Sequence, residues 1–223
     1  MQSASYIGFG GILALAMVAA SSALSASTET FVNAPQPRVT APVGSKTETA
    51  IFAGGCFWGV EGVFDHVKGV VSATSGYAGG TTTSPSYEEV STGTTGHAEA
   101  VRVVFDPAKV SYAELLRVYF SVVADPTTLN AQGPDHGSQY RTALFPQSDG
   151  QERVARAYLQ QLTASHTFTR PIVTRIEHTT RFYPAEGYHQ GFLEKNPTYP
   201  YIVINDAPKV DALRRIMPNI YRS

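Results

Sequence analysis

The sequence predicts an α+β fold, a two-layer sandwich in which helices pack on one β-sheet. Segments with strand character and segments with helix character intermix along the chain without a regular strand–helix repeat, which argues against a doubly wound parallel sheet. Hydrophobic residues make up 43% and charged residues 16% of the 223 residues. The chain can therefore bury a core, and its length fits one main domain.

The first half of the chain contains three strand signals and one helix signal. In chain order, the candidates are the strand Thr49–Ala53, the helix Cys56–His66, the strand Gly69–Tyr77 and the strand Ala98–Phe105. The last signal is the strongest, because its residues alternate and place Glu99 on one face with Val101, Val103 and Phe105. A carboxyl group is therefore expected among large apolar side chains.

The second half alternates between helix and strand candidates. They are the helix from Ser111 to about Val123, the strand Gln139–Phe145, the helix from Ser148 to about Leu162, the strand Ile172–Glu177 and the helix from Asp206 to Pro218. Ser111 and Glu114 have the spacing of a capping box. Asp206 is a candidate N-cap, with Pro208 near the start of the last helix.

Residues 1–26 have the pattern of a secretory signal peptide. Ile7–Ala20 is an uncharged, mostly apolar run, and small residues follow over Ser21–Ala26. The run is shorter than the about 20 residues of a membrane span. We expect export to the periplasm or out of the cell; an uncleaved anchor or a wrongly assigned start codon are the alternatives. Residues 27–47 are polar and proline-rich, which indicates a flexible linker before a catalytic domain over residues 48–223 with a helical tail.

Charge and cysteine content exclude several protein classes. Lys and Arg number 17 against 18 Asp and Glu, which argues against nucleic-acid binding, and we expect no stable membrane partner. Cys56 is the only cysteine, so the chain forms no internal disulfide and no cysteine-based structural zinc site. The six histidines are scattered without metal-binding spacing, and we expect neither a metal nor a cofactor.

Cys56 is the candidate nucleophile. It follows Gly54 and Gly55 where a strand candidate gives way to a helix candidate, and the N–H groups of a helix N-terminus favour the thiolate. The alternative is a buried, inert cysteine. Phe57 and Trp58 come next; only one of two consecutive helical residues can point squarely into a core, so the other is free to line a surface site.

Glu99 is the candidate general acid, because burial on an apolar strand face raises the pKa of a carboxyl group. The alternative is a glutamate at the start of a strand that reaches water or pairs with an arginine. Tyr87 and Tyr140 are candidate hydrogen-bond donors, although a core or surface position would explain either. Asp135 lies in a turn sequence, and turn chemistry alone would explain it.

Five stretches of the sequence match a known family. They are GGCFWGVE (54–61), GVVSATSGYAGG (69–80), SPSYEEVSTGTTGHAEAVRVVFDP (84–107), DPTTLNAQGPDHGSQYRTALF (125–145) and YPAEGYHQGFLEKNP (183–197). On these motifs the chain resembles the A-type peptide methionine sulfoxide reductases. The resemblance implies an α+β sandwich around a mixed sheet, of ferredoxin-like type, and the reduction of methionine S-sulfoxide without a cofactor.

The resemblance also implies a role for each candidate residue. By its position in the motifs, Cys56 is the nucleophile that becomes a sulfenic acid, and Glu99 is the proton donor to the sulfoxide oxygen. Tyr87 and Tyr140 are the hydrogen-bond donors to that oxygen, and Asp135 is the carboxylate that organises the site. Phe57 and Trp58 form the seat of the substrate methyl group. A polarised sulfoxide needs these parts, since its sulfur takes a nucleophile while its oxygen takes a proton.

The chain departs from the family at the recycling step. Many relatives resolve the sulfenic acid with a second cysteine, but here Cys56 is alone and Ser91 stands where relatives often carry cysteine. We therefore expect an external thiol to complete the cycle: a thioredoxin-like protein, a glutaredoxin with glutathione, or a small thiol. The expected substrates are free methionine sulfoxide and oxidised-methionine proteins or peptides, and export would make this a repair of envelope or secreted proteins under oxidative stress.

Two other functions stay open on residue types. A single-cysteine thiol hydrolase would pair Cys56 with His97 or His189. A binder of oxidised methionine without turnover would explain the absence of a second cysteine.

Overall fold

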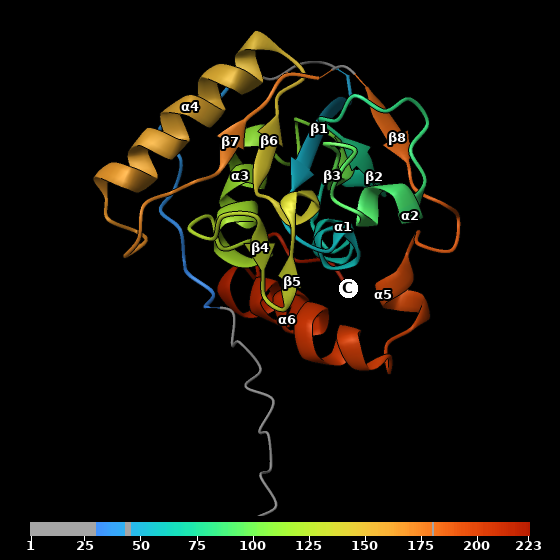
Figure 1. Ribbon diagram of the computed structural model, residues 1–223. Helices are drawn as coiled ribbons and strands as arrows, with labels where there is room; N and C mark the ends of the chain where they lie inside the picture. Colours follow the sequence, from blue (N-terminus) through green and yellow to red (C-terminus); the bar gives the residue numbers. More distant parts are fainter. Residues whose placement is uncertain (1–29, 43–45, 180) are drawn as a thin grey trace, which may run out of the picture.

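The computed structural model describes residues 30–42, 46–179 and 181–223 (Figure 1), so the predicted signal peptide lies outside the described residues. Six strands form one sheet in the order β7-β6-β1-β3-β2-β8. Their bounds are Glu48–Ala53 for β1, Val70–Ala78 for β2, Ala98–Phe105 for β3, Ala143–Phe145 for β6, Arg175–Ile176 for β7 and Phe182–Pro184 for β8. β6 and β7 are parallel and the other pairs antiparallel, so the sheet is mixed. The strands β4 (Ala131–Gln132) and β5 (Asp135–His136) form a separate hairpin.

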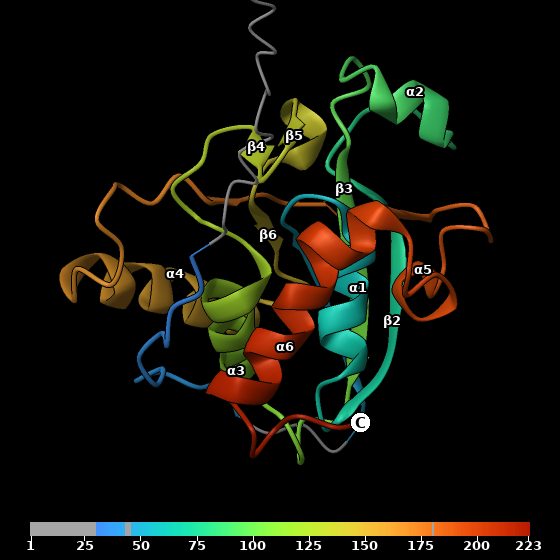
Figure 2. The ribbon, with the colours of Figure 1, turned by 90° about the horizontal axis from the view of Figure 1, so that it is seen from below.

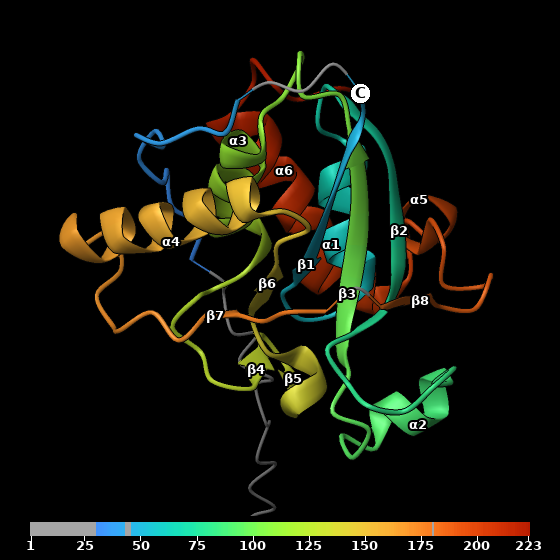
Figure 3. The same ribbon diagram turned by 90° about the horizontal axis from the view of Figure 1, so that it is seen from above.

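The helices pack mainly on one side of this sheet. They are α1 (Phe57–Asp65), α2 (Tyr87–Ser91), α3 (Tyr112–Val118) continued by the π-helix η1 (Tyr119–Val123), the 3-10 helix η2 (Ser138–Tyr140), α4 (Asp149–Ala164), α5 (Phe192–Lys195), the π-helix η3 (Ile202–Asp206) and α6 (Ala207–Ile216). The helices α1 and α6 lie in front of the strands in Figure 2 and behind them in the opposite view of Figure 3. The predicted α+β two-layer sandwich is confirmed. No helix in the described part of the chain is both long and apolar enough to cross a membrane.

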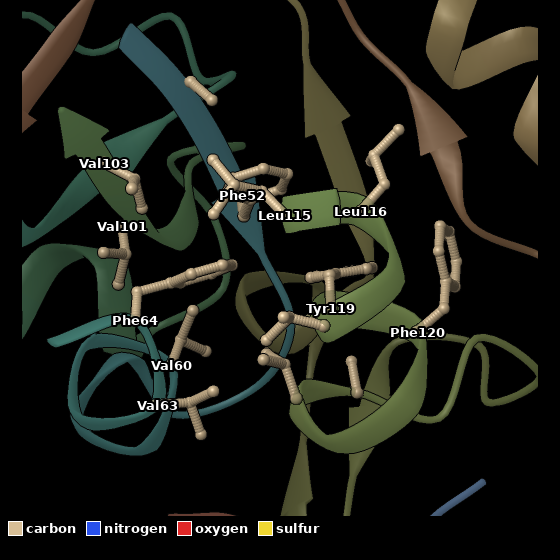
Figure 4. Packing of buried hydrophobic residues seen from close by; sticks show 14 of the residues in the cluster. Phe52, Val60, Val63, Phe64, Val101, Val103, Leu115, Leu116, Tyr119 and Phe120 are labelled. Carbon is tan, nitrogen blue, oxygen red and sulfur yellow. The ribbon is translucent and has the colours of Figure 1, made fainter. Parts of the chain in front are cut away.

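The core lies between the sheet and α1, α3 and η1 (Figure 4). On β3, Val101 and Val103 are fully buried on the helix side, as the alternation predicts. The ring of Phe52 from β1 stacks on Phe64 of α1 at a centroid distance of 4.9 Å and on Tyr119 at 5.7 Å. Apolar burial of this kind stabilises the fold by roughly 1.5–3 kcal/mol per large side chain and fixes α1 against β1 and β3.

Several predicted elements are shorter than expected. The strand predicted from Gln139 begins only at Ala143, because Gly137 at φ +136° turns the chain into η2. The strand predicted over Ile172–Glu177 is reduced to β7. Ser111 accepts the N–H of Glu114 (3.1 Å), but the Glu114 carboxylate pairs with Arg117 (2.9 Å) and does not complete a capping box.

The reciprocal capping box occurs instead at the start of α2, which the sequence reasoning did not predict. Ser86 accepts the N–H of Glu89, and the Glu89 carboxylate accepts the N–H of Ser86 at 2.8 Å. This short helix matters for the site, because its first residue is Tyr87.

Part of the predicted flexible linker is packed along α3 and α4. The N–H of Val32 donates to the carbonyl of Ser121 in η1 (3.0 Å), and the hydroxyl of Tyr158 in α4 donates to the carbonyl of Pro35 (2.7 Å). Ala34 is buried. The flexible-linker prediction therefore does not hold for these residues, because the Ser121 carbonyl of η1 and the Tyr158 hydroxyl of α4 satisfy their backbone groups.

Candidate active site

Cys56 lies at the junction between β1 and α1, where two glycines allow very close packing. Gly55 has φ +89°, and a Cβ there would lie 2.6 Å from the Cβ of Gln132. A Cβ at Gly54 would lie 2.9 Å from the Cβ of Ala124. Only glycine fits this turn. Cys56 itself is the N-cap residue of α1 and is a partly exposed residue.

Glu99 on β3 is bonded to the residue that follows the cysteine. The N–H of Phe57 donates to Glu99 Oε2 at 2.9 Å, and Glu99 is only 3% exposed. Burial raises the pKa of Glu99 from an ordinary 4.5 to about 8; the Phe57 N–H opposes this rise, while Asp135 and Asp206 add to it. Glu99 is therefore a protonated acid at neutral pH, and the alternative of a solvated glutamate at a strand end does not apply.

The thiol of Cys56 is less acidic than the helix N-terminus alone predicts. Burial raises the pKa of Cys56 well above its usual range, and the carboxyl groups of Asp206, Glu99 and Asp135 add to the rise. The N–H of Trp58 opposes it and is outweighed. The expectation of a resting thiolate is therefore wrong, because burial of the thiol, together with the nearby carboxyl groups, outweighs the effect of the helix N-terminus.

Tyr87 from α2 and Tyr140 from η2 lie on the same site. Burial raises the pKa of both phenols, and both also respond to the charges of Glu99 and Cys56. Both hydroxyls are therefore protonated donors near the acid and the thiol. Tyr87 is held in place by Glu186, whose carboxylate accepts the N–H of Tyr87 at 2.9 Å and the hydroxyl of Tyr77 at 2.8 Å.

Phe57 and Trp58 divide their roles as expected for consecutive helical residues. Phe57 is fully buried, whereas Trp58 is partly exposed. The indole stacks on the ring of Phe192 at a centroid distance of 3.8 Å, nearly parallel at 10°. Its Nε1–H donates to His189 Nδ1 at 3.0 Å. Trp58 thus forms a braced aromatic wall beside Cys56.

The two histidines considered for a thiol hydrolase are engaged elsewhere. His97 accepts the N–H of Gly80 at Nδ1 (3.2 Å), and its Nε2 lies 2.8 Å from the carbonyl of Thr82. His189 accepts from Trp58, and burial lowers its pKa, so it is neutral. Neither imidazole serves as the base that a hydrolase needs beside Cys56. Among the described residues, no group of three or more His, Cys, Asp or Glu side chains is arranged to hold a metal ion.

The C-terminal segment contributes site residues that the sequence reasoning missed. The hydroxyl of Tyr201 donates to Asp135 Oδ2, and Tyr201 responds to the charge of Cys56. Asp206 is 1% exposed and lies against the first turn of α1, where a Cβ on Gly59 would overlap Asp206 Oδ1. The N-cap signal of Asp206 identified a helix start, and no pattern singled out Tyr201. The N-cap signal of Asp206 does not indicate which distant helix the C-terminal segment covers.

Comparison with known proteins adds to this geometry. The family model for peptide methionine sulfoxide reductase matches residues 48–219. Peptide methionine sulfoxide reductase MsrA 2 of Mesorhizobium japonicum is 58% identical over 175 residues, covering 78% of this chain and 90% of that protein. The enzyme named MsrA of Deinococcus radiodurans is 51% identical over 172 residues, covering 77% and 83%.

A solved structure agrees. The reduced form of Mxr1 from Saccharomyces cerevisiae superimposes with a TM-score of 0.63 at 34% identity, covering 74% of this chain and 95% of that one. With a protonated acid, a thiol and two phenols gathered at one site, and relatives of this identity, the chain belongs to the A-type peptide methionine sulfoxide reductases, which reduce methionine S-sulfoxide with electrons from thiols.

Proposed function

We propose that Cys56 and Glu99 together carry out the oxygen transfer. Cys56 Sγ attacks the sulfoxide sulfur while Glu99 donates its proton to the sulfoxide oxygen, and Tyr87 and Tyr140 donate hydrogen bonds to that oxygen. The hydroxyl then passes to Sγ: an Sγ–O bond forms while the S–O bond and the new Sγ–S bond both break. The thioether leaves, Cys56 becomes a sulfenic acid, and the thiol proton restores Glu99. The balance is one thiol and one sulfoxide giving one sulfenic acid and one thioether.

The observation that carries this proposal is the hydrogen bond between Phe57 N–H and Glu99 Oε2 (2.9 Å), which places a buried acid at the first residue after Cys56. The pKa of about 8 supports the donor role, since an acid near the working pH is both protonated and able to release its proton. Trp58 supports a seat for the substrate methyl group, because it is partly exposed, lies two residues after Cys56 and has its indole held by Phe192.

The return to the thiol needs two equivalents of an external thiol. The first thiol attacks the Cys56 sulfenic acid and releases water, forming a mixed disulfide. The second attacks that disulfide, which restores Cys56 and releases the oxidised reductant. The chain has no other cysteine, so this resolution is intermolecular, and a thioredoxin-like protein, glutaredoxin with glutathione or a small thiol fits it.

A quenched time course with a methionine sulfoxide peptide tests the sequence of steps. Without reductant, the chain should form one methionine per Cys56, and a dicarbonyl trap with mass spectrometry should find a sulfenic acid there. Adding dithiothreitol, thioredoxin or glutathione separately should give many turnovers with at least one donor. Cys56→Ser should form no methionine. A single equivalent with every donor would instead indicate a binder without turnover.

We further propose that the protein is exported and repairs oxidised methionines of envelope or secreted proteins. The support is the apolar run Ile7–Ala20 followed by the small residues Ser21–Ala26. N-terminal sequencing of the protein from fractionated cells tests this. A chain that begins after the small residues in the exported fraction is expected, and an intact Met1 in the cytosolic fraction would contradict it.

A further inference from the structure

A second buried carboxyl group, Glu61 of α1, takes no part in the chemistry above. It is 3% exposed and bonded through both oxygens. The hydroxyl of Ser75 on β2 donates to Glu61 Oε2 at 2.7 Å, and the N–H of Gly191 donates to Glu61 Oε1 at 3.2 Å. An ionisable group inside a helix–sheet interface costs free energy unless it is hydrogen-bonded. These two hydrogen bonds offset the cost of burying the Glu61 carboxyl group.

Gly191 lies between the two residues that brace the tryptophan. It has φ +60° and forms the N-cap of α5. His189, two residues before it, accepts the indole N–H of Trp58, and Phe192, the next residue, stacks on the indole. The orientation of the Gly191 peptide therefore sets where both braces stand relative to Trp58.

Ser75 fixes the same loop through its backbone. Its N–H donates to Gln190 Oε1 at 3.0 Å, and Gln190 Nε2 donates to its carbonyl at 2.9 Å. Ser75 thus holds Glu61 with its side chain and the neighbour of Gly191 with its main chain. Glu61, Ser75 and the Gln190–Gly191 peptide form one hydrogen-bonded unit that joins α1, β2 and α5.

We propose that Glu61 is a positioning residue for the substrate methyl site: by holding the Gly191 N–H, it sets the turn that places His189 and Phe192 against Trp58. The inference rests on the proposed role of Trp58 as a wall of that site. Glu61 itself contacts neither substrate nor Cys56 in this scheme; it acts through the 189–192 turn.

The surroundings of Glu61 suggest how a conservative variant behaves. Burial raises the pKa of Glu61 to about 7, the Ser75 and Gly191 bonds oppose the rise, and the nearby carboxylates of Asp65 and Glu194 add to it. A protonated Glu61 can donate to Ser75 Oγ, because the Ser75 hydroxyl has a second acceptor in the carbonyl of Phe57 at 3.4 Å. Glutamine reproduces this pattern, donating to Ser75 and still accepting from Gly191.

The test compares Glu61→Ala with Glu61→Gln and uses Trp58, the only tryptophan, as an intrinsic probe. Glu61→Ala should shift the Trp58 emission to the red and raise KM for a methionine sulfoxide peptide about tenfold, near 1.4 kcal/mol, with kcat within about twofold. Glu61→Gln should restore both readouts. Ser75→Ala, which removes only a hydroxyl, should show a smaller change in the same direction and serves if Glu61→Ala does not fold. The control is Glu194→Ala on α5, whose half-exposed carboxylate makes no bond to Gly191.

Three results would overturn the inference: unchanged emission and KM in Glu61→Ala or, if that variant does not fold, in Ser75→Ala; a fall in kcat at constant KM; or no recovery in Glu61→Gln. The emission readout does not depend on turnover. A failure of the oxygen-transfer proposal, seen as an active Cys56→Ser or Glu99→Gln, is therefore distinguishable from a failure of this one.

Discussion

The active site is assembled from two regions that are held in different ways. The scaffold region, which is the β1–α1 junction with β3, supplies Cys56 and Glu99. Its geometry is set by strand register, in which Glu99 pairs with Tyr77 of β2. The C-terminal region, residues 186–206, supplies Tyr201 and Asp206 and is held by side-chain contacts with α1 and the β4–β5 hairpin. Backbone pairing thus places the reacting groups, while a packed segment adjusts their ionisation and forms the walls.

The largest expected effect is in the scaffold region. Glu99→Gln keeps an oxygen that can accept the Phe57 N–H but loses the transferable proton, so the rate of methionine formation should fall by roughly 10²–10⁴-fold. Single-turnover kinetics with a sulfoxide peptide measures this directly. A rate of Glu99→Gln near that of the parent protein would mean that the scaffold region does not supply the reacting acid.

The same substitution should change how stability depends on pH. Folding raises the pKa of Glu99 from an ordinary 4.5 to about 8, so the folded protein binds the proton more tightly. That contribution is fully present below about pH 4.5 and is lost as pH rises toward 8, by an amount on the order of 4–5 kcal/mol. Urea unfolding at pH 5 and pH 8 should show a smaller loss in Glu99→Gln than in the parent. The same change in the free energy of unfolding with pH in both proteins would contradict a buried, protonated Glu99.

The scaffold region could be predicted from the sequence, and the C-terminal region could not. The alternation over Ala98–Phe105 determines the face of Glu99, and the Gly54–Gly55 pair before a helix indicates the turn at Cys56, because both signals are local. The contact of Asp206 with α1 depends on tertiary packing between segments far apart in the chain. No local pattern encodes it. Burial, to which the Asp206 charge adds, raises the pKa of Cys56 and reverses the expectation drawn from the helix N-terminus.

A matched pair of glycine variants tests the packing between the two regions. Alanine normally stabilises a helix over glycine by up to about 1 kcal/mol, but a Cβ at Gly59 would overlap Asp206 Oδ1. Gly59→Ala should therefore lower the free energy of unfolding by about 1–3 kcal/mol. Gly187→Ala is the control, because nothing lies within 4 Å of its added Cβ. A more stable Gly59→Ala would mean that Asp206, at the end of η3, is not packed against α1.

Asp206→Asn tests whether the C-terminal region controls the ionisation of the nucleophile. The Asp206 charge contributes more to the raised pKa of Cys56 than Glu99 or Asp135 does, and asparagine removes that charge with little change of shape. The pH dependence of Cys56 alkylation by iodoacetamide should move to lower pH, with a several-fold faster rate near neutral pH. An unchanged pH profile of alkylation would mean that the Asp206 charge does not affect the Cys56 thiol. The scaffold region alone would then set the ionisation of Cys56.

The smallest effect is expected where the C-terminal region only supports another side chain. Tyr201→Phe removes the hydroxyl that donates to Asp135 while keeping the ring, which meets Trp58 edge-on at a centroid distance of 6.0 Å. Losing one such bond costs about 1 kcal/mol, so kcat/KM should fall by about fivefold. The pKa of Asp135 should also rise, because this hydrogen bond opposes the effect of burial. A loss as large as that of Glu99→Gln would move Tyr201 from the walls of the site into its chemistry, and the division between a reacting scaffold and a supporting C-terminal segment would no longer describe this enzyme.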